Sequence, residues 1–507
     1  MALVGALRTF GAPAPLTLGV RTHTYKPNMA NEKNSKALVY KGDNLQVMDL
    51  PDGVVNEKAH PLADALDEFI QRIDDIHDAV FTMVPQSAAT ITKRFNKALK
   101  AIKAAEEKLK NGSPAEASHA GASIIESGYE LDAISRSRQP EAIERNLFVG
   151  MFSEFDQFTG MLIRELYNRR PDLLKSISRT ITLGDLLKHD SLDSAKASIL
   201  EGEIESIRRE SYVEQFSILK NRFEVPLTEF SDWPAFIEAS QRRNLMVHCG
   251  GVVSPQYLQV CNSVGYKFDK PPKAGERLAL GPDYVNNTAR TMIKVAFMLT
   301  HTLWRKVLPD ESDAANEHLN DQIYRLLCAK RWRIAEQLGK FSLTKPMTRG
   351  ANDVQTRIRI CNTSIAQKHL GMKEELEQQL KATDWTASFR DFRLAVAILR
   401  DEHARAAALM QEIGKRGELI REISYHQWPL FAKFRETQEF QSAYEKVYGY
   451  PFYLKAERTA DLAREQAEAR NIDEGNPKDQ PLAKKATIKK VAKKTTKLPA
   501  QGNNAQA

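Results

Sequence analysis

The residues with the clearest potential for chemistry lie in the stretch QRRNLMVHCGG, residues 241–251. Arg243, Asn244 and His248 stand there around three apolar residues. An arginine offers a planar fork of donors that can hold a phosphate and stabilise charge that grows on it. A histidine has an ordinary pKa of about 6.5, which suits proton transfer near neutral pH, and an asparagine can orient either partner. Together they suffice for metal-free RNA cleavage, in which a ribose 2′-OH is deprotonated and attacks the adjacent phosphorus.

The spacing of these residues sets a geometric problem if the stretch is helical. On a straight helix Asn244 and His248 lie about 40° apart, whereas Arg243 lies about 140° from His248. One helix therefore brings both tips together only if the arginine folds round or the helix end unwinds at Gly250 and Gly251. A second copy of the chain is a further solution, because a two-fold axis would place two arginines and two histidines around one cleft.

Two other interpretations fit the same residues. Arg243 could be a cation near the last carbonyls of the helix and His248 could cap it, since both are favourable at the negative end of the helix dipole. The cluster could also bind a nucleotide or RNA without cleaving it. Glu238 lies one turn before Arg242 and is expected to be its salt-bridge partner. No carboxylate cluster accompanies the motif, so no metal is predicted, and no glycine-rich nucleotide pattern predicts a cofactor.

Composition places the chain among globular proteins. A length of 507 residues predicts about three domains, and the chain is 42% apolar and 27% charged. No apolar run is long enough to cross a bilayer, so no membrane association is expected. The cysteines (Cys249, Cys261, Cys328 and Cys361) form no CxxC pair. This pattern argues against a zinc site and a disulfide framework, and it predicts a cytoplasmic protein.

The positive charge is concentrated at the C-terminus. Residues 478–507 hold eight lysines and one aspartate, so they carry +7 of the net charge of +8 and leave a nearly neutral body. We expect 455–507 to be a charged, disordered tail that is drawn to RNA or DNA backbones, or to acidic surfaces, by charge alone. A purely solubilising role is the alternative. The predicted nucleic-acid-binding residues are Lys484, Lys485, Lys489, Lys490, Lys493, Lys494 and Lys497.

The N-terminal residues 1–60 are predicted to be a disordered lead-in. The first 31 residues contain basic residues and no acidic one, which resembles a targeting peptide. An arginine and two prolines interrupt the apolar stretch in MALVGALRTFGAPAPL, however. We therefore favour a true start at Met29, with the preceding residues as an upstream extension.

Helical periodicity begins at residue 61 and predicts an all-α protein. Three patterns, 61–84, 87–112 and 114–137, can pair as an N-terminal helical region over 61–138. A bundle of four helices is expected over 139–308, and its second helix spans 191–223. The third helix opens at Asp232, a plausible N-cap, and the fourth spans 284–308 and is apolar on most sides. A loop with a short strand or hairpin is expected between the third and fourth helices.

From 313 to 450 the helices become shorter and come in pairs. Their spacing of about 34 residues is close to the tetratricopeptide period, and alanines such as Ala395 and Ala406 allow close packing. We expect a TPR-like helical array that offers a surface to a protein partner. Irregular helical hairpins that only pack on the bundle are the alternative. His301 in the fourth bundle helix and His426 in the array are expected to be packing residues. The alternative for His301 is that it assists the site, if the fourth helix borders the cleft.

The run W..F.E...RRNLMVH, followed by GGVVSPQYL, resembles the HEPN superfamily. The family hallmark is an arginine, a polar residue that is often asparagine, three variable residues and a histidine, and Arg243, Asn244 and His248 match it in order. The resemblance covers 139–308 and implies a HEPN-like bundle that dimerises. It further implies a composite ribonuclease site of the kind used by toxins and antiviral defence systems. The rival expectation is a non-catalytic adaptor that uses the bundle for dimerisation or nucleotide binding and the array for partners.

Overall fold

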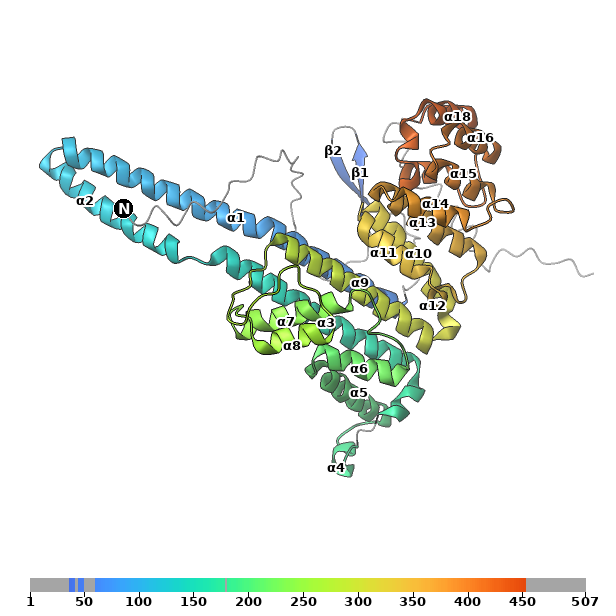
Figure 1. The fold of residues 1–507 in the computed structure, drawn as a ribbon, viewed down its shortest axis with the longest axis horizontal. Coiled ribbons are helices and arrows are strands. Elements are labelled where there is room, and N and C mark those ends of the chain that lie inside the picture. Colours follow the sequence, from blue (N-terminus) through green and yellow to red (C-terminus); the bar gives the residue numbers. More distant parts are fainter. Residues whose placement is uncertain (1–35, 42–43, 50–59, 178–179, 453–507) are drawn as a thin grey trace, which may run out of the picture. The chain divides into compact units, whose positions relative to one another are not determined.

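The computed structural model of the protein describes residues 36–41, 44–49, 60–177 and 180–452 (Figure 1). The first elements are two antiparallel strands, β1 (Lys36–Lys41) and β2 (Asn44–Asp49), in register from Lys36 opposite Asp49 to Lys41 opposite Asn44. The sequence analysis did not predict this hairpin, which lies within the expected lead-in. All remaining secondary-structure elements of the described chain are helices, and this confirms the all-α class.

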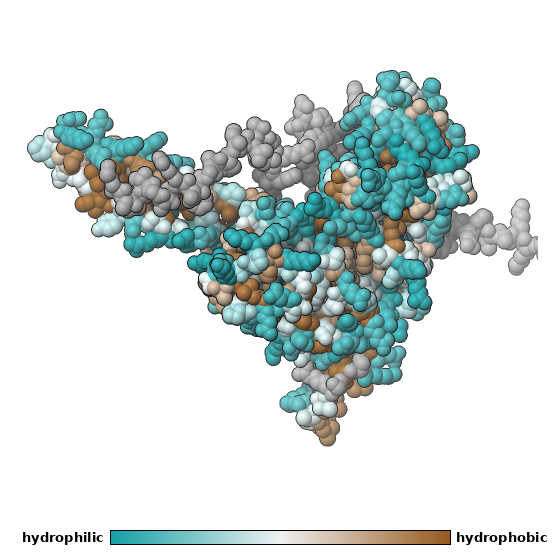
Figure 2. Space-filling model, in the orientation of Figure 1, coloured by the Kyte–Doolittle hydropathy of each residue, from teal (hydrophilic) through white to brown (hydrophobic). Residues whose placement is uncertain are grey.

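The first helices form a long hairpin. Helix α1 (Pro61–Asn111) packs along α2 (Pro114–Arg136) and then along α3 (Gln139–Arg169), as Figure 1 shows. The turn is well specified, because Ser113 and Glu116 form a capping box and Pro114 follows the cap at the start of α2. Where α1 meets α2, buried side chains such as Ala98, Ala105 and Ala120 are small. The two helices therefore pack through small residues, and Figure 2 shows hydrophobic surface on this hairpin. The exposed larger apolar side chains of α1 and α2 are Phe81, Met83, Leu109, Ile125 and Tyr129.

The predicted break between 61–84 and 87–112 is wrong. Helix α1 runs continuously through Pro85, although a proline inside a helix costs about 3 kcal/mol. Packing against a neighbouring helix on both sides of the proline offsets that cost. The same packing makes the start of α1 part of the bundle, because Leu66 and Phe69 lie in one core with Phe155 and Phe158 of α3.

The bundle is built around α3 and α9. Helix α3 packs against α5 (Leu192–Arg209), α7 (Trp233–His248) and α9 (Pro282–Val307), and α6 (Tyr212–Phe223) packs against α7 and α9. Phenylalanines fill the centre of the bundle: Phe148, Phe152, Phe155 and Phe158 of α3, Phe216 of α6 and Phe236 of α7. The short elements η1 (Pro171–Ser176), α4 (Leu183–Leu186) and η2 (Pro309–Glu311) complete this part.

Two expectations for the bundle need correction. The predicted helix 191–223 is divided into α5 and α6, because Ser211 caps α6 by accepting a hydrogen bond of 3.3 Å from the Glu214 N–H. The segment between α7 and α9 contains a helix, α8 (Pro255–Ser263), capped by Ser254. The expected strand is reduced to one bridge between Val252 and Arg277.

From residue 312 onward, short helices that are neighbours in the sequence pack against one another. The buried alanines Ala395, Ala397, Ala406 and Ala407 lie where α15 meets α16 and agree with the expected close packing, whereas Ala404 and Ala408 are exposed. The tetratricopeptide assignment stays a prediction. The elements are α10 (Ser312–Cys328), α11 (Trp332–Ser342), α12 (Lys345–Thr348), α13 (Asp353–Leu370), α14 (Lys373–Lys381), α15 (Arg390–Leu399), α16 (His403–Ile413), α17 (Glu422–Gln427), η3 (Pro429–Phe431), η4 (Phe434–Glu436) and α18 (Gln438–Tyr448).

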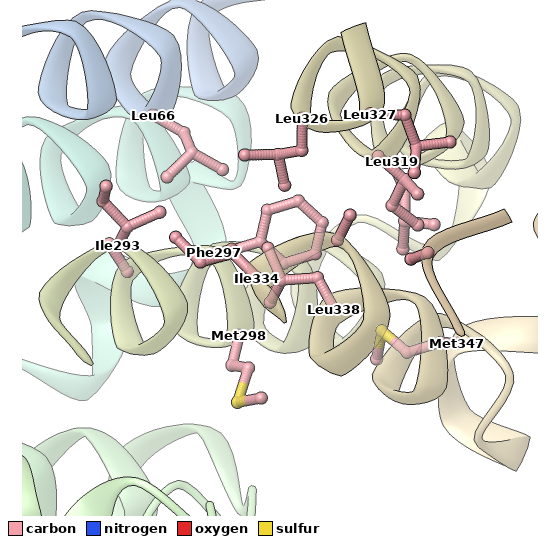
Figure 3. Close-up of a cluster of buried hydrophobic side chains, with 14 of the residues drawn as sticks. Leu66, Ile293, Phe297, Met298, Leu319, Leu326, Leu327, Ile334, Leu338 and Met347 are labelled. Carbon is pink, nitrogen blue, oxygen red and sulfur yellow. The ribbon is translucent and has the colours of Figure 1, made fainter. Parts of the chain in front are cut away.

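The first array pair shares its core with the bundle. Figure 3 shows Leu66 of α1 and Phe297 of α9 facing Leu326 of α10 and Ile334 of α11. All these side chains are buried and belong to one hydrophobic cluster.

A buried polar chain runs beside this core and contains His301, which confirms that His301 is a packing residue. The Arg305 guanidinium donates to His301 Nδ1 (2.9 Å), so this histidine carries its proton on Nε2 and donates to His318 Nδ1 (3.3 Å). His318 in turn donates to Asp67 of α1 (2.9 Å). Burial, followed by the charges of Arg305, His318 and Arg359, holds the pKa of His301 well below its ordinary value.

Acid should therefore destabilise the fold through His301. Below about pH 6.5 the unfolded chain protonates this imidazole and the folded chain does not, so the group should remove about 1.4 kcal/mol of unfolding free energy per pH unit. Urea unfolding at several pH values between about 5 and 7 measures this slope. His301→Gln should flatten it, and His119→Gln, on the exposed surface of α2, should not. Equal slopes in the wild type and His301→Gln would contradict the assignment.

Candidate functional site

Helix α7 carries all three predicted catalytic residues. It begins where the sequence predicts, but Asp232 does not act as the expected side-chain cap. Asp232 occupies the N-cap position, and Pro234 lies in the first turn. The Asp232 side chain forms no capping hydrogen bond, however, because it forms an ion pair with Lys294 of α9. Lys294 is buried, and a buried ammonium group needs such a counter-ion.

The end of α7 is closed by its own backbone. The N–H groups of Cys249 and Gly251 both donate to the Leu245 carbonyl at 2.9 Å, and Gly250 and Gly251 have φ values of 58° and 82°. Glycine favours such positive φ values, which explains why the helix ends there. His248 is the last residue of α7, and its side chain is exposed. Backbone N–H groups therefore close this helix end, and in the described chain the His248 imidazole forms no capping hydrogen bond there.

Arg242 belongs to a hydrogen-bonded cluster that joins α7 to α8 and α9. Its Nε lies 2.9 Å from Glu238, which is only 1% exposed, and this contact confirms the predicted salt bridge. Glu238 also accepts hydrogen bonds from the hydroxyls of Tyr257 in α8 (2.5 Å) and Tyr284 in α9 (2.7 Å). The Arg242 guanidinium lies over the Tyr284 ring, 3.8 Å from its centroid. One carboxylate thereby links three helices, and burial and that charge together raise the pKa of both tyrosines.

Arg243 has a different environment. Its Nη1 donates to Asn244 Oδ1 at 3.0 Å, and its buried Nε has no hydrogen-bond partner. The side chain is half-buried and lies near Asp156 of α3, which accepts a hydrogen bond of 2.7 Å from the Tyr212 hydroxyl of α6. Burial raises the pKa of Asp156, against the opposing effects of the Tyr212 hydrogen bond and the charges of Arg243 and Arg208. A carboxyl group thus stands beside the candidate arginine.

The structure brings two of the three predicted residues together. Arg243 and Asn244 are hydrogen-bonded, whereas no hydrogen bond joins His248 to either residue within the described part of the chain. The side chains of Arg243 and His248 therefore do not meet within one chain, in agreement with the angle of about 140° that the helical spacing places between them. The sequence analysis did not identify Asp156 or Tyr212. The available signal was Asp156, an acidic residue among the phenylalanines of FSEFDQF.

The remaining predicted residues lie elsewhere. His426 contacts the Tyr444 hydroxyl (3.2 Å) and stacks on Phe452, which confirms a packing role. The predicted tail lysines, residues 484–497, lie outside the described residues. In the described ranges no group of three or more His, Cys, Asp or Glu side chains is arranged to hold a metal ion, and no helix there is long and apolar enough to cross a membrane.

The two neighbouring arginines should respond oppositely to substitution. Arg242→Gln leaves the buried Glu238 charge without its cation, so it should lower the unfolding free energy by about 3–5 kcal/mol. Arg243→Gln removes no ion pair and should change it by less than about 1 kcal/mol. Urea unfolding of both variants measures the difference. Adding Glu238→Gln to Arg242→Gln should restore part of the loss, and equal effects of the two single variants would contradict the division of roles.

Comparison with known proteins identifies no relative: no protein-family model, no curated protein and no solved structure matches this chain.

Proposed function

We propose that the protein is a metal-independent endoribonuclease of the HEPN type that acts as a homodimer, in a toxin or antiviral defence role. One observation carries the proposal. Arg242 pairs with Glu238 and so helps to hold α7 in place. In the described chain, Arg243, Asn244 and His248 form no hydrogen bond or ion pair with another helix. Polar residues that the fold does not need, at one helix end, are candidates for chemistry on a ligand.

The proposed reaction uses each residue for one task. His248 accepts the proton of a ribose 2′-OH, and the 2′-oxygen then forms a bond to the adjacent phosphorus. The bond from phosphorus to the 5′-oxygen breaks, and that oxygen takes up a proton from water, to which His248 then releases its own. The products are a cyclic phosphate and a 5′-hydroxyl. Arg243 stabilises the charge on the phosphoryl oxygens, and Asn244 orients the guanidinium through their hydrogen bond.

A second copy of the chain is the proposed partner at the end of α7. Val247 and Val252 flank His248 and are 48% and 39% exposed. Apolar side chains beside a polar functional group are typical of an interface that a partner covers. A two-fold axis near this point would bring Arg243 of one copy and His248 of the other to one cleft. The basic tail would add affinity for RNA that depends on salt and not on sequence.

The ribonuclease proposal is tested with labelled RNA in EDTA. The wild type should cleave, and His248→Ala or Arg243→Ala should reduce the rate by about 100-fold or more, because each removes a group that acts in the transition state. His119→Ala is the matched control, since it removes an exposed histidine from α2. Cleavage that needs a divalent metal, or that survives His248→Ala, would contradict the mechanism.

Mixing inactive variants tests the composite site. After subunit exchange, a dimer of Arg243→Ala and His248→Ala chains holds one intact arginine and one intact histidine on different copies. If one cleft combines them, the mixture should recover part of the activity although each variant alone is inactive. No recovery, with exchange verified by differently tagged copies, would show that the residues do not act across two chains.

The exposed valines give a prediction about assembly. Val247→Glu should place two charges at the proposed interface and convert a dimer into a monomer, with loss of cleavage. Light scattering coupled to gel filtration measures the mass, and Ile125→Glu on α2 is the control for an exposed apolar residue elsewhere. A Val247→Glu variant that stays dimeric would exclude this surface as the interface.

A non-catalytic adaptor is the second candidate. The half-buried position of Arg243 and its bond to Asn244 favour it, because they limit how freely the guanidinium reaches a phosphate. In that case the bundle serves dimerisation or nucleotide binding and the array binds a protein. RNA binding without cleavage by the wild type, across several RNA types, would support this function over the first.

A further inference from the structure

The basic loop, residues 264–281 between α8 and α9, brings an arginine to the end of α7. Its charged residues are four cations and two carboxylates, with a net charge of +2: Lys267, Asp269, Lys270, Lys273, Glu276 and Arg277. All four cations are exposed, and none of them forms an ion pair in the described part of the chain. Cations that no carboxylate of the fold neutralises create a positive field that attracts an anionic ligand.

Backbone hydrogen bonds hold this loop against the glycine turn that ends α7. The Leu278 N–H donates to the Gly251 carbonyl (2.9 Å). The Val253 N–H donates to the Glu276 carbonyl (2.8 Å). Arg277 lies between these two bonds in the chain, so its backbone is fixed beside the turn.

An apolar cluster supports the basic loop. Leu245 of α7 and Tyr257 of α8 are buried in this cluster. The side chains of the loop that pack against it are Tyr266, Phe268 and Leu278. The rings of Tyr266 and Phe268 meet edge to face, with 4.8 Å between their centroids. The loop is therefore a packed part of the fold, and its cations project from a defined surface.

Arg277 reaches the turn that follows His248. A Cβ atom on Gly250 would lie 3.7 Å from Arg277 Nη2, so the guanidinium is close to this turn. His248 precedes Gly250 by two residues, and its side chain is exposed. One chain therefore places an exposed guanidinium and an exposed imidazole at the same helix end.

No carboxylate of the described chain pairs with the Arg277 guanidinium. Glu276 is its neighbour in the sequence, but the Glu276 carboxylate accepts a hydrogen bond from the Lys273 N–H (2.9 Å). Glu238 of α7 is already compensated by Arg242. An arginine without a carboxylate partner can hold a phosphate through two parallel N–H donors. A phosphate group is therefore the ligand that suits this position.

We propose that Arg277 binds a backbone phosphate of RNA next to the ribose that His248 deprotonates. The lysines of the basic loop attract the neighbouring phosphates by charge alone. The inference rests on the proposed function, because it adds a substrate contact to the same site. Phosphate contacts fix the register of a strand and carry no sequence information, so Arg277 positions the RNA and does not select its sequence.

The position of Arg277 is compatible with the proposed dimer. Arg277 pairs with Val252 in a single antiparallel bridge, and Val252 is close to His248 in the sequence. Protein interfaces have an apolar centre and a polar, accessible rim. The exposed valines suit the centre of the interface, and Arg277 suits its rim, where the guanidinium stays open to the RNA.

The test is fluorescence anisotropy of a short labelled RNA with the full chain in EDTA, at several salt concentrations. The RNA carries 2′-O-methyl groups throughout, so it binds without being cleaved. Arg277→Gln should weaken binding by about 10-fold. It should also lower the slope of log affinity against log salt by about 0.7, the value for one phosphate contact on a single strand. Arg277→Lys keeps the charge but loses the paired donors, so it should keep the slope and recover only part of the affinity.

Arg349→Gln is the matched control. Arg349 follows α12 in the array, is exposed, and forms no ion pair in the described chain. Its substitution removes the same charge from a surface away from α7, so it should change the affinity by less than about twofold. Thermal unfolding of each variant shows whether the chain is folded.

Three results would overturn the proposal. They are wild-type affinity and salt slope in Arg277→Gln, an equal loss of affinity in Arg349→Gln, and no binding of the methylated RNA by the wild type. Cleavage of unmodified RNA is measured separately. Failure of the ribonuclease proposal alone would appear as binding that depends on Arg277 without any cleavage.

Discussion

The buried carboxylate of Glu238 is the constraint on which the candidate site depends. A charge at a 1% exposed position must be compensated, and Glu238 obtains one cation and two phenol hydroxyls from α7, α8 and α9. These bonds fix the rotation of α7 about its axis. They also hold α8, the element that follows the glycine turn and begins close to His248 in the sequence.

Fixing Arg242 determines where its neighbours point. Successive helical residues are about 100° apart, so an Arg242 that is turned to Glu238 directs Arg243 to another side of α7. There Arg243 meets Asn244 and the charge of Asp156, while His248 at the helix end remains exposed. The angular separation of Arg243 and His248 follows from their five-residue spacing on the helix, and the role of Arg242 fixes the side of α7 on which each of them lies. The proposed second copy of the chain would bring an arginine and a histidine together again.

Local signals in the sequence predict α7 almost completely. Pro234 near its start and the glycine pair after its end set the bounds, and the spacing of Glu238 and Arg242 identifies their ion pair. The partners from other helices were not predictable, since Tyr257, Tyr284 and Asp156 meet α7 only through tertiary packing. The same limit explains two errors in the elements. Pro85 predicts a helix break, but packing against neighbouring helices keeps α1 continuous. The local sequence gives no sign that Ser211 ends one helix and caps the next, α6.

The sequence pattern also suggests domain boundaries that cut through one core. A fragment of residues 139–308 would lose Leu66 and Phe69 of α1, which pack within the same cluster as α3 and α9, and would uncover the aromatic side chains that they touch. It would also lose α10 and α11, whose Leu326 and Ile334 face Phe297 (Figure 3). Full burial of one large apolar side chain contributes about 1.5–3 kcal/mol, so several such losses approach the whole stability of a domain. The bundle and the first array pair therefore share one hydrophobic core, while the division of the chain at 308 and 313 stays a prediction.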